Sequence, residues 1–523
     1  MKLFAIFIYL FALCGCHSST TEKKLDKQIL RTSLGTDIVS FDPRKGVSMH
    51  NQAVVRMLFT GLVRLNEEMI PQMELAESYQ VSKDFKQYTF KIRECYWSDG
   101  SRITAQDFEN TWKAALTPAY ASANTNLFFN LKNGKKTFLG ELPIDELGVR
   151  ALDSATLIID LEEPNPRFLE ILINSIFSPV HPSMQTSAPN EKKIISSGPF
   201  ILNKYLFQDR IILEKNQGYW NATAVQLHQL HYYIIKDQAT ALLMFEKKEL
   251  DWLGEPTSRI PTDSIPTLKQ TMNLHTCQIA GQQWMFLNTT RFPFNNVNIR
   301  KALTYAIDRK MLMQDVMHLD DPSPIVGLVP QVLKKGSPFA AGQTPLPMNV
   351  KDLFSLGLQE LGVSLEQFPP ITINYSTSTK AIAAIQQMWE EQLGIRVKIE
   401  NVDGPILVRK FYDQDFQIVW SGWVVQHNDP SNTLEIFKLK NVQPNYTGWE
   451  NKDFIHYTTS SYSAISEEDK WKNVCAAEKV FLNEMPSIPV TEMTIFYLQQ
   501  PYVKNISVNS LLLIDFDRAV IEH

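Results

Sequence analysis

Apolar and polar residues alternate with two different periods along the first half of the chain. Alternating or short apolar runs predict strands at 28–34, 88–93, 154–161, 210–215 and 231–235. Helical spacing of apolar residues predicts a helix over 51–65, which Gly61 interrupts, and a second helix after Thr104. Asp107, three residues beyond Thr104, forms a variant of the capping box and supports that second start.

Strands and helices alternate after about residue 277. The predicted strands are 371–375, 397–402 and 416–422, and a helix over 380–393 lies between the first two. This β-α-β order predicts a partly parallel sheet and an α/β fold. Helical spacing also covers 299–317 and the segment that begins after Ser466 and ends before Pro486. Between these regions, 322–347 is a connector rich in proline and glycine.

The extreme N-terminus has the pattern of a targeting segment. Lys2 precedes an apolar run over 3–13, which is too short to cross a hydrocarbon layer of ~30 Å as a helix. Next come Leu13-Cys14-Gly15-Cys16 and a polar run, and this pattern is similar to a bacterial lipobox. It implies that residues 1–15 are a lipoprotein signal peptide and that Cys16 carries the lipid. A plain secretory signal cleaved nearby is the alternative.

Composition and charge narrow the class of protein. A length of 523 residues predicts about three domains, and 44% hydrophobic with 20% charged residues is ordinary for globular proteins. A net charge of −5 gives no general attraction for nucleic acid, so no nucleic-acid partner is predicted. Apart from the signal region, only Cys95, Cys277 and Cys475 remain, and they form no C-x-x-C or other metal-ligand spacing.

The familiar catalytic motifs are missing from the sequence. It contains no G-x-S-x-G elbow, no H-E-x-x-H, no phosphate-binding G-x-x-x-x-G-K-[ST] and no G-x-G-x-x-G after a strand. No catalytic residue, cofactor or metal is therefore predicted. A secreted hydrolase and a purely structural surface lipoprotein are minor alternatives for the function of the chain.

Ten short motifs, in a consistent order over nearly the whole mature chain, resemble the solute-binding proteins of oligopeptide ABC importers. This is family 5, the peptide- and nickel-binding class. The motifs are SFDP (40–43), LFTGL (58–62), AESY (76–79), YTFKIR (88–93), YWSDG (96–100), TAQDF (104–108), SGPF (197–200), GYWN (218–221), PFNNVNIRKAL (293–303) and AIDR (306–309). Each motif is weak alone, and their order and spacing together carry the resemblance.

The resemblance implies a two-lobed periplasmic-binding-protein fold of type II, in its large three-domain form. Each lobe would hold a mixed sheet, and the lobes would close over a ligand by a hinge. Lobe I would be discontinuous, built from 16–49, 178–277 and 491–523. A small domain over 50–177 would be inserted in it, and lobe II would cover 278–490.

The resemblance also implies a function and its partners. The protein would capture oligopeptides and deliver them to a membrane-embedded ABC permease driven by cytoplasmic ATPases. It would act as a monomer in the bacterial cell envelope, on the periplasmic side, held to the lipid bilayer through Cys16. The alternative is a receptor of the same fold for a cell-wall or modified peptide, a sugar or a metal complex.

Two strands would pair with the backbone of a bound peptide, because the backbone is what peptides of different sequence share. By similarity to the family, the pairing residues are Asp37, Ile38 and Val39 after the first turn, and Gly422, Trp423 and Val424 around a Gly-Trp pair. Trp423 would form the wall of a pocket, and core packing is its alternative role.

The pocket for the ligand's terminus departs from the family pattern. Peptide receptors carry an aspartate shortly after Gly-Trp that pairs with the α-ammonium, and this chain has Gln426 there, followed by His427 and Asp429. An arginine expected just before Gly-Trp is replaced by Trp420. Asp37 or Asp429 could supply the missing charge. Otherwise the ligand would be blocked at its N-terminus or would not be a peptide.

Overall fold

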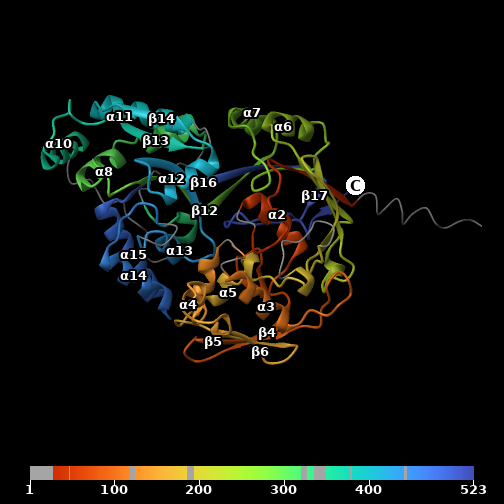
Figure 1. The fold of residues 1–523 in the computed structure, drawn as a ribbon. Helices are drawn as coiled ribbons and strands as arrows, with labels where there is room; N and C mark the ends of the chain where they lie inside the picture. The colour runs from red at the N-terminus through yellow and green to blue at the C-terminus, as the bar shows by residue number, and fades with distance from the viewer. Residues whose placement is uncertain are drawn as a thin grey trace, which may run out of the picture.

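The computed structural model describes residues 28–45, 48–117, 120, 122, 124–184, 194–319, 327–334, 349–376, 380–440 and 445–522. Residues 1–27, with the predicted signal peptide and Cys16, lie outside the described residues. The molecule is a two-lobed α/β structure (Figure 1). Two long antiparallel strands, β12 (Leu274–Leu287) and β16 (Ser487–Gln499), run from one lobe into the other.

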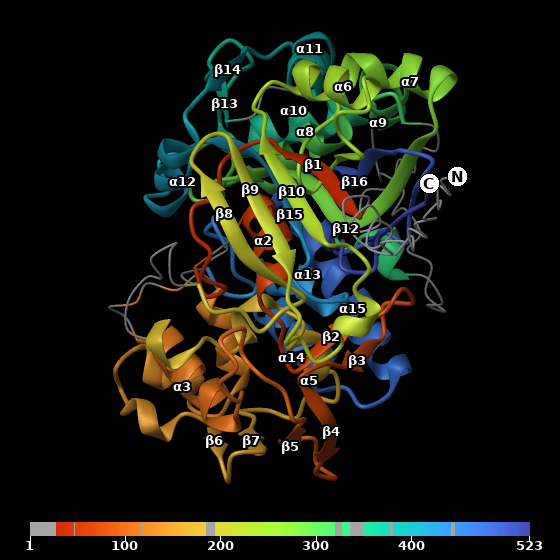
Figure 2. The same cartoon turned by 90° about the vertical axis from the view of Figure 1, so that its right-hand side faces the viewer.

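The main described elements of lobe I are strands of the large sheet and the helices that cover it. These are β1 (Ile29–Leu34), β8 (Phe200–Leu206), β9 (Arg210–Lys215), β10 (Gln229–Ile234) and β11 (Trp252–Gly254), with α2 (Met49–Leu58), α6 (Gln238–Glu246) and α7 (Ile265–Thr271). β1 is parallel to β10 and β11, and β10, β9 and β8 follow as an antiparallel meander (Figure 2). The lobe therefore has the mixed sheet that the resemblance implied.

Lobe II contains the remaining strands of this sheet. They are β13 (Ile371–Tyr375), β14 (Val397–Asn401) and β15 (Ile418–Val424), and β13 is parallel to both others. Its helices are α8 (Val297–Tyr305), α9 (Arg309–Met311), α10 (Val350–Leu361), α11 (Lys380–Leu393), α12 (Gly404–Tyr412), α13 (Ser431–Glu435), α14 (Lys452–Ser463) and α15 (Glu467–Glu484). The predicted β-α-β order and the partly parallel sheet are confirmed.

A single ten-stranded sheet joins the two lobes, in the order β14-β13-β15-β12-β16-β11-β1-β10-β9-β8. The first part of β12 pairs only with β16, while its last part, from Gly281 onward, also pairs with β15 of lobe II. Between these parts the β12–β16 register shifts, from Gln278 to Gln282 and again at Trp284. The ladder is thus irregular at the point where the strands pass from one lobe to the other.

A smaller antiparallel sheet lies apart from the large one, at the bottom of Figures 1 and 2. Its order is β4 (Ala76–Val81), β5 (Gln87–Ile92), β7 (Thr156–Asp160) and β6 (Val149–Ala151). We call this sheet and its helices α3 (Ala105–Ala115), α4 (Gly134–Phe138) and α5 (Phe168–Ile171) the small domain. The exact domain boundaries given above stay predictions.

The remaining strands are short and pair locally. β2 (Val63–Leu65) pairs with β3 (Pro71–Met73), β17 (Val503–Lys504) with β20 (Val520–Ile521), and β18 (Ser507–Val508) with β19 (Ile514–Asp515). Arg64 on β2 lies 3.0 Å from Asp515 and 2.9 Å from Asp517, so buried ion pairs attach the C-terminal segment to the chain near the small domain.

Two predicted helices are wrong in extent. The helix predicted over 51–65 ends at Leu58, where Phe59 turns extended and the carbonyl of Leu58 accepts from Gly198 N–H at 2.9 Å. A Cβ on Gly198 would lie 2.7 Å from the Leu58 carbonyl carbon, so the SGPF motif brings two backbones into contact. The helix predicted over 299–317 breaks after Tyr305, because Asp308 caps a new turn by accepting from Met311 N–H.

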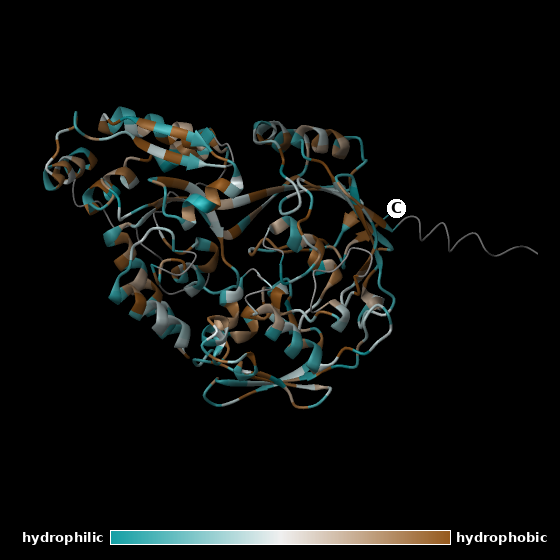
Figure 3. Ribbon diagram, in the orientation of Figure 1, coloured by the Kyte–Doolittle hydropathy of each residue, from teal (hydrophilic) through white to brown (hydrophobic). Residues whose placement is uncertain are grey.

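Apolar side chains form a core within each lobe, and Figure 3 shows hydrophobic positions in both the helices and the strands. The lobe I core includes Leu30, Val54, Leu213, Tyr232 and Trp252, and the lobe II core includes Leu303, Ile373, Ile385, Trp389 and Ile418.

Several motif residues that carry the family resemblance are buried and structural. Arg300 donates to the carbonyl oxygens of Glu484, Met485 and Phe294, and thereby supports the C-terminal end of α15. Arg309 donates to the carbonyl of Pro489 at 2.7 Å. These contacts satisfy main-chain acceptors that water cannot reach.

Candidate ligand-binding cleft

A cavity of about 1140 Å³ lies between lobe I, lobe II and the small domain. β16 contributes residues 491–496, and the end of β15 with the turn after it contributes 420–426. The opposite walls come from the start of α2, the segment 255–263 and residues 173–175. The volume exceeds the ~300–1,000 Å³ of sites for drug-sized ligands, so an extended ligand has room.

One edge of β15 is exposed to this cavity. Along its other edge, β15 pairs with β12 from Ile418 to Val424. β13 pairs only with Ile418 and Val419, so residues 420–424 meet no further strand among the described residues. All five of these residues line the cavity. The backbone N–H and C=O groups of this edge are therefore placed to pair with an added strand.

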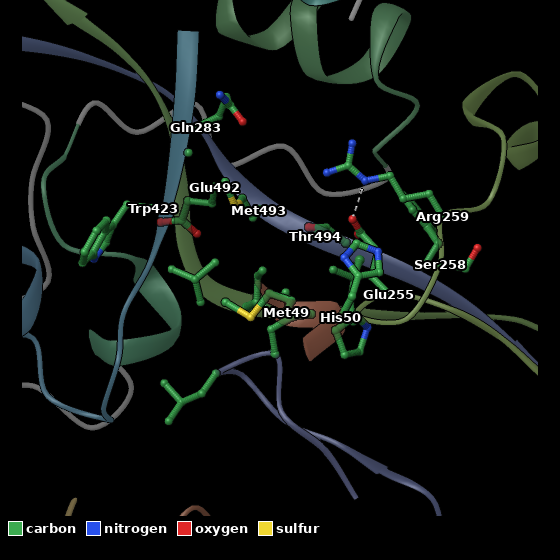
Figure 4. A pocket seen from close by; sticks show the side chains of 18 of the residues that line it. Met49, His50, Glu255, Ser258, Arg259, Gln283, Trp423, Glu492, Met493 and Thr494 are labelled. Carbon is green, nitrogen blue, oxygen red and sulfur yellow. Dashed lines mark hydrogen bonds and ion pairs between the residues drawn. The ribbon is translucent and has the colours of Figure 1, made fainter. Parts of the chain in front are cut away.

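Apolar side chains cover much of the cavity wall. Trp423 stands on one side of it, with Met493 and Met49 between it and the groups on the other side (Figure 4). The Trp423 indole N–H is buried and has no hydrogen-bond partner within the described part of the chain. A Cβ on Gly422 would lie 2.1 Å from the Met493 methyl group, so glycine keeps this wall open.

The basic side chains of the cavity are already matched by carboxylates. Arg56 lies 3.1 Å from Asp515, and Lys380 lies 2.6 Å from Asp263 across the lobes. Arg259 lies 2.9 Å from Glu255, as the dashed line in Figure 4 marks.

A histidine faces these groups from the start of α2. Burial lowers the pKa of His50, and the charge of Arg259 lowers it further. The imidazole is therefore neutral at pH 7 and can either donate or accept a hydrogen bond.

The structure brings together half of the residues that the resemblance assigned. Trp420, Gly422, Trp423, Val424 and Gln426 all line the cavity. The Gln426 side-chain amide donates to Asn124 Oδ1 at 3.2 Å, which connects lobe II to a residue just after α3. Their roles toward a ligand stay predictions.

Asp37, Ile38 and Val39 are not among the residues that line the cavity. Asp37 accepts from the Tyr205 hydroxyl at 2.9 Å and from Gln208 N–H at 2.8 Å, so the β8–β9 hairpin holds its carboxylate. The roles of Asp37, Ile38 and Val39 toward a ligand therefore stay predictions without support from the cavity.

His427 and Asp429 lie buried behind the wall rather than in it. Burial lowers the pKa of His427 to about 4, and neither ring nitrogen has a hydrogen-bond partner in the described regions. Asp429 Oδ2 lies 3.5 Å from Lys470 and 3.6 Å from Arg167, so its charge is already balanced. Asp429 is thus no substitute for an amine-binding aspartate.

A cluster of charged residues lies between the small domain and lobe II. We call it the Arg167 cluster, and its members are Arg167, Glu170, Asp429, Glu467 and Lys470. Arg167, next to α5 of the small domain, contacts Asp429 and Glu467 of lobe II and donates to the Ala464 carbonyl at 3.2 Å. Burial, then the charge of Asp429, raises the pKa of Glu170 to about 8. Nothing in the sequence pattern indicates this contact, because its members are about 300 residues apart.

Within the described residues there is no group of three or more His, Cys, Asp and Glu side chains that could hold a metal ion. Cys95, Cys277 and Cys475 form no disulfide with one another. A search of the described helices finds none with the length and hydropathy needed to cross a membrane.

Two α/β lobes joined by crossing strands, with a cavity at the junction, define a ligand-binding protein of the periplasmic type. The sequence agrees with this class. Residues 71–445 match the family described as "Bacterial extracellular solute-binding proteins, family 5 Middle", and the chain belongs to that family.

Similar proteins cover nearly the whole chain. The oligopeptide-binding protein OppA of Bacillus subtilis is 33% identical over 97% of this chain and 96% of its own length. The dipeptide-binding protein DppE of the same organism is 29% identical over 95% and 94%. Among solved structures, OppAIV of Borrelia burgdorferi has a TM-score of 0.84 at 25% identity, over 95% of this chain and 100% of that one. OppA of Listeria monocytogenes bound to peptide has a TM-score of 0.79 at 25% identity, over 95% and 99%.

Proposed function

We propose that this protein captures oligopeptides in the cavity and delivers them to an ABC permease in the membrane. The observation that carries the proposal is the free edge of β15 at 420–424, which lies in the cavity wall and offers main-chain donors and acceptors. The names of the similar proteins from Bacillus subtilis and Listeria monocytogenes support the same ligand class. The protein acts as a binding protein and not as an enzyme.

In this proposal the peptide lies as an added strand along Gly422, Trp423 and Val424. Backbone pairing is independent of sequence, so it gives affinity for many peptides. The remaining volume takes side chains of different size together with water. Trp423 forms one wall, and Trp420 with Gln426 shapes the pocket at one end of the ligand.

Delivery depends on closure of the lobes around the peptide. The lobes touch through Lys380–Asp263 on one side and through the Arg167 cluster on the other. A ligand that contacts both lobes binds the closed form better and shifts the population toward it. The permease then distinguishes loaded from empty protein by the relative position of the lobes.

Peptide capture predicts one-to-one retention without turnover. The purified mature protein is incubated with a mixture of short peptides and observed by native mass spectrometry. Bound peptides should keep their mass and raise the melting temperature by mass action. Release of shortened peptides would show a hydrolase instead, and retention of none would contradict the proposal.

A matched pair of variants makes this test specific for the cavity. Gly422→Phe places a ring where Met493 and the ligand strand lie, and should abolish retention. Gly404→Phe adds the same ring at the exposed start of α12, where a Cβ has no neighbour within 4 Å, and should bind normally. Equal retention by both variants would show that the ligand binds outside this cavity.

We also propose that the mature protein is held in the cell envelope by lipid on Cys16, on the periplasmic side, and that it acts as a monomer. Cys16→Ala should leave an unprocessed precursor without lipid, because no thiol remains for the thioether. Cys14→Ala is the control, since it keeps Gly15-Cys16 intact and should be processed. Labelled fatty acid on the Cys16→Ala protein would contradict the anchor.

A receptor for a modified peptide is the second candidate. It is favoured by Gln426, which lines the cavity and brings no negative charge for an α-ammonium. Adding N-acetylated copies to the peptide mixture separates the two candidates, because a receptor for blocked ligands retains the acetylated copies in preference.

A further inference from the structure

Glu492 is the one carboxylate lining the cavity that has no basic side chain beside it, within the described chain. It lies on β16, next to Met493 (Figure 4). The salt bridges within 4.0 Å pair Glu255 with Arg259 and Asp263 with Lys380, and none includes Glu492.

The contacts of Glu492 hold its side chain in place without neutralising it. Oε1 accepts from Gln331 N–H at 2.7 Å, and Oε2 accepts from the Gln278 amide at 2.7 Å. Lys334, the basic group that acts on it from nearby, is 3.2 Å from Glu478 and is already paired. Burial raises the pKa of Glu492, and the Gln331 N–H, Lys334 and the Gln278 amide oppose that rise.

The partial burial of this carboxylate costs free energy while the cavity is empty, and a bound cation would offset that cost. A partly buried anion with neutral partners gains most from a cation placed against it. Each carboxylate oxygen has a second lone pair, so it can accept from a ligand while it keeps its present bonds. The position of Gln426 carries no charge, and Asp429 is already balanced, so neither competes for that cation.

We propose that Glu492 is the counter-ion for a cationic group of the ligand, an ammonium or guanidinium group. This rests on the proposed function and adds to it a ligand class, namely peptides that carry a positive charge within reach of β16. The charge could belong to the α-amine or to a lysine or arginine side chain, and the experiment distinguishes these sources.

The test uses alanine pentapeptides with lysine or norleucine at each position in turn, with free or acetylated N-termini. Norleucine has nearly the shape of lysine without its charge. The mixture is offered to the wild-type protein and to Glu492→Gln, and bound peptides are quantified by mass spectrometry. In Glu492→Gln the new amide can still accept from Gln331 N–H, and the Gln278 amide can flip to accept from it.

A matched control removes the same charge far from the cavity. Glu366 is exposed in the loop before β13, so Glu366→Gln changes the net charge equally. The wild-type protein and Glu366→Gln should both retain the cationic member of at least one peptide pair about tenfold more than its uncharged partner. Glu492→Gln should retain both members equally.

The outcomes separate the two proposals. Preference for lysine over norleucine assigns the contact to a side chain, and preference for free over acetylated termini assigns it to the α-amine. Equal retention by the wild-type protein, or an unchanged preference in Glu492→Gln, would overturn the role of Glu492 alone. Retention of no peptide would overturn the proposed function and this inference with it.

Discussion

Replacing Arg167 with methionine is expected to weaken ligand binding by roughly ten- to a hundredfold. Arg167 joins the small domain to Asp429, Glu467 and the Ala464 carbonyl of lobe II, so the proposed opening of the lobes would break these contacts. Loss of one partner of a buried ion pair costs roughly 3–5 kcal/mol. In the variant Lys470 still balances Asp429, so the free energy of lobe closure is weakened by less than this full cost.

The measurement combines calorimetry with solution scattering. The free Arg167→Met protein should have a larger radius of gyration than the wild-type protein, because the open form is more populated. Arg409→Met is the control, since Arg409 is 83% exposed and pairs, among the described residues, with Asp413 at the C-terminal end of its helix. An unchanged Kd together with an unchanged scattering curve would show that Arg167 does not hold the lobes together.

Replacing Glu170 with glutamine is expected to reduce the loss of folding stability that the wild-type protein shows as the pH rises from 5 to 8. The pKa of Glu170 is raised to about 8 in the folded protein, from 4.5. Below 4.5 the carboxyl is protonated in both states and contributes no difference. Between 4.5 and 8 only the unfolded chain ionises, so the folded state loses stability as the pH rises, and above 8 the loss is complete.

Glutamine does not ionise, so the folding stability of Glu170→Gln does not fall between pH 4.5 and 8 through this residue. The melting temperature of Glu170→Gln should exceed that of the wild-type protein by roughly 3–6 °C at pH 8 and match it near pH 4.5. The other charged groups around Glu170 are Arg167, Asp429, Lys470 and Glu467, and all stay in place. Glu163→Gln alters an exposed carboxylate nearby and should change neither curve.

Much of the fold was predictable because its elements depend on local sequence. The starts of α3 and α15 follow from capping residues within a few positions of each start, and α11 has the limits that its apolar spacing predicted. The end of α2 was not predictable, because Gly198 approaches it from 140 positions away. The break after Tyr305 follows from a local signal, the cap by Asp308, which the helical spacing over 299–317 outweighed in the prediction.

The candidate site was predictable only where the family motif reaches it. The Gly-Trp pair led to the free edge of β15, whereas Asp37 lies outside the cavity and its carboxylate accepts from the β8–β9 hairpin. Glu492 belongs to no motif, and its proposed role rests on the absence of a basic side chain within 4.0 Å of it among the described residues. Such a charge balance depends on which strands meet, and periodicity does not report it.

The irregular register where β12 and β16 pass between the lobes has a mechanical consequence. Gln282 pairs with Glu492 beside that irregularity, so the carboxylate proposed to contact the ligand lies close to the place where the lobes would pivot. If the lobes rotate as proposed, residues near the pivot move little, and contacts farther from it, such as Lys380–Asp263 and Arg167–Asp429, move more. In the proposed closure, a small adjustment around a bound cation would therefore give a larger displacement at the surfaces that another protein can contact.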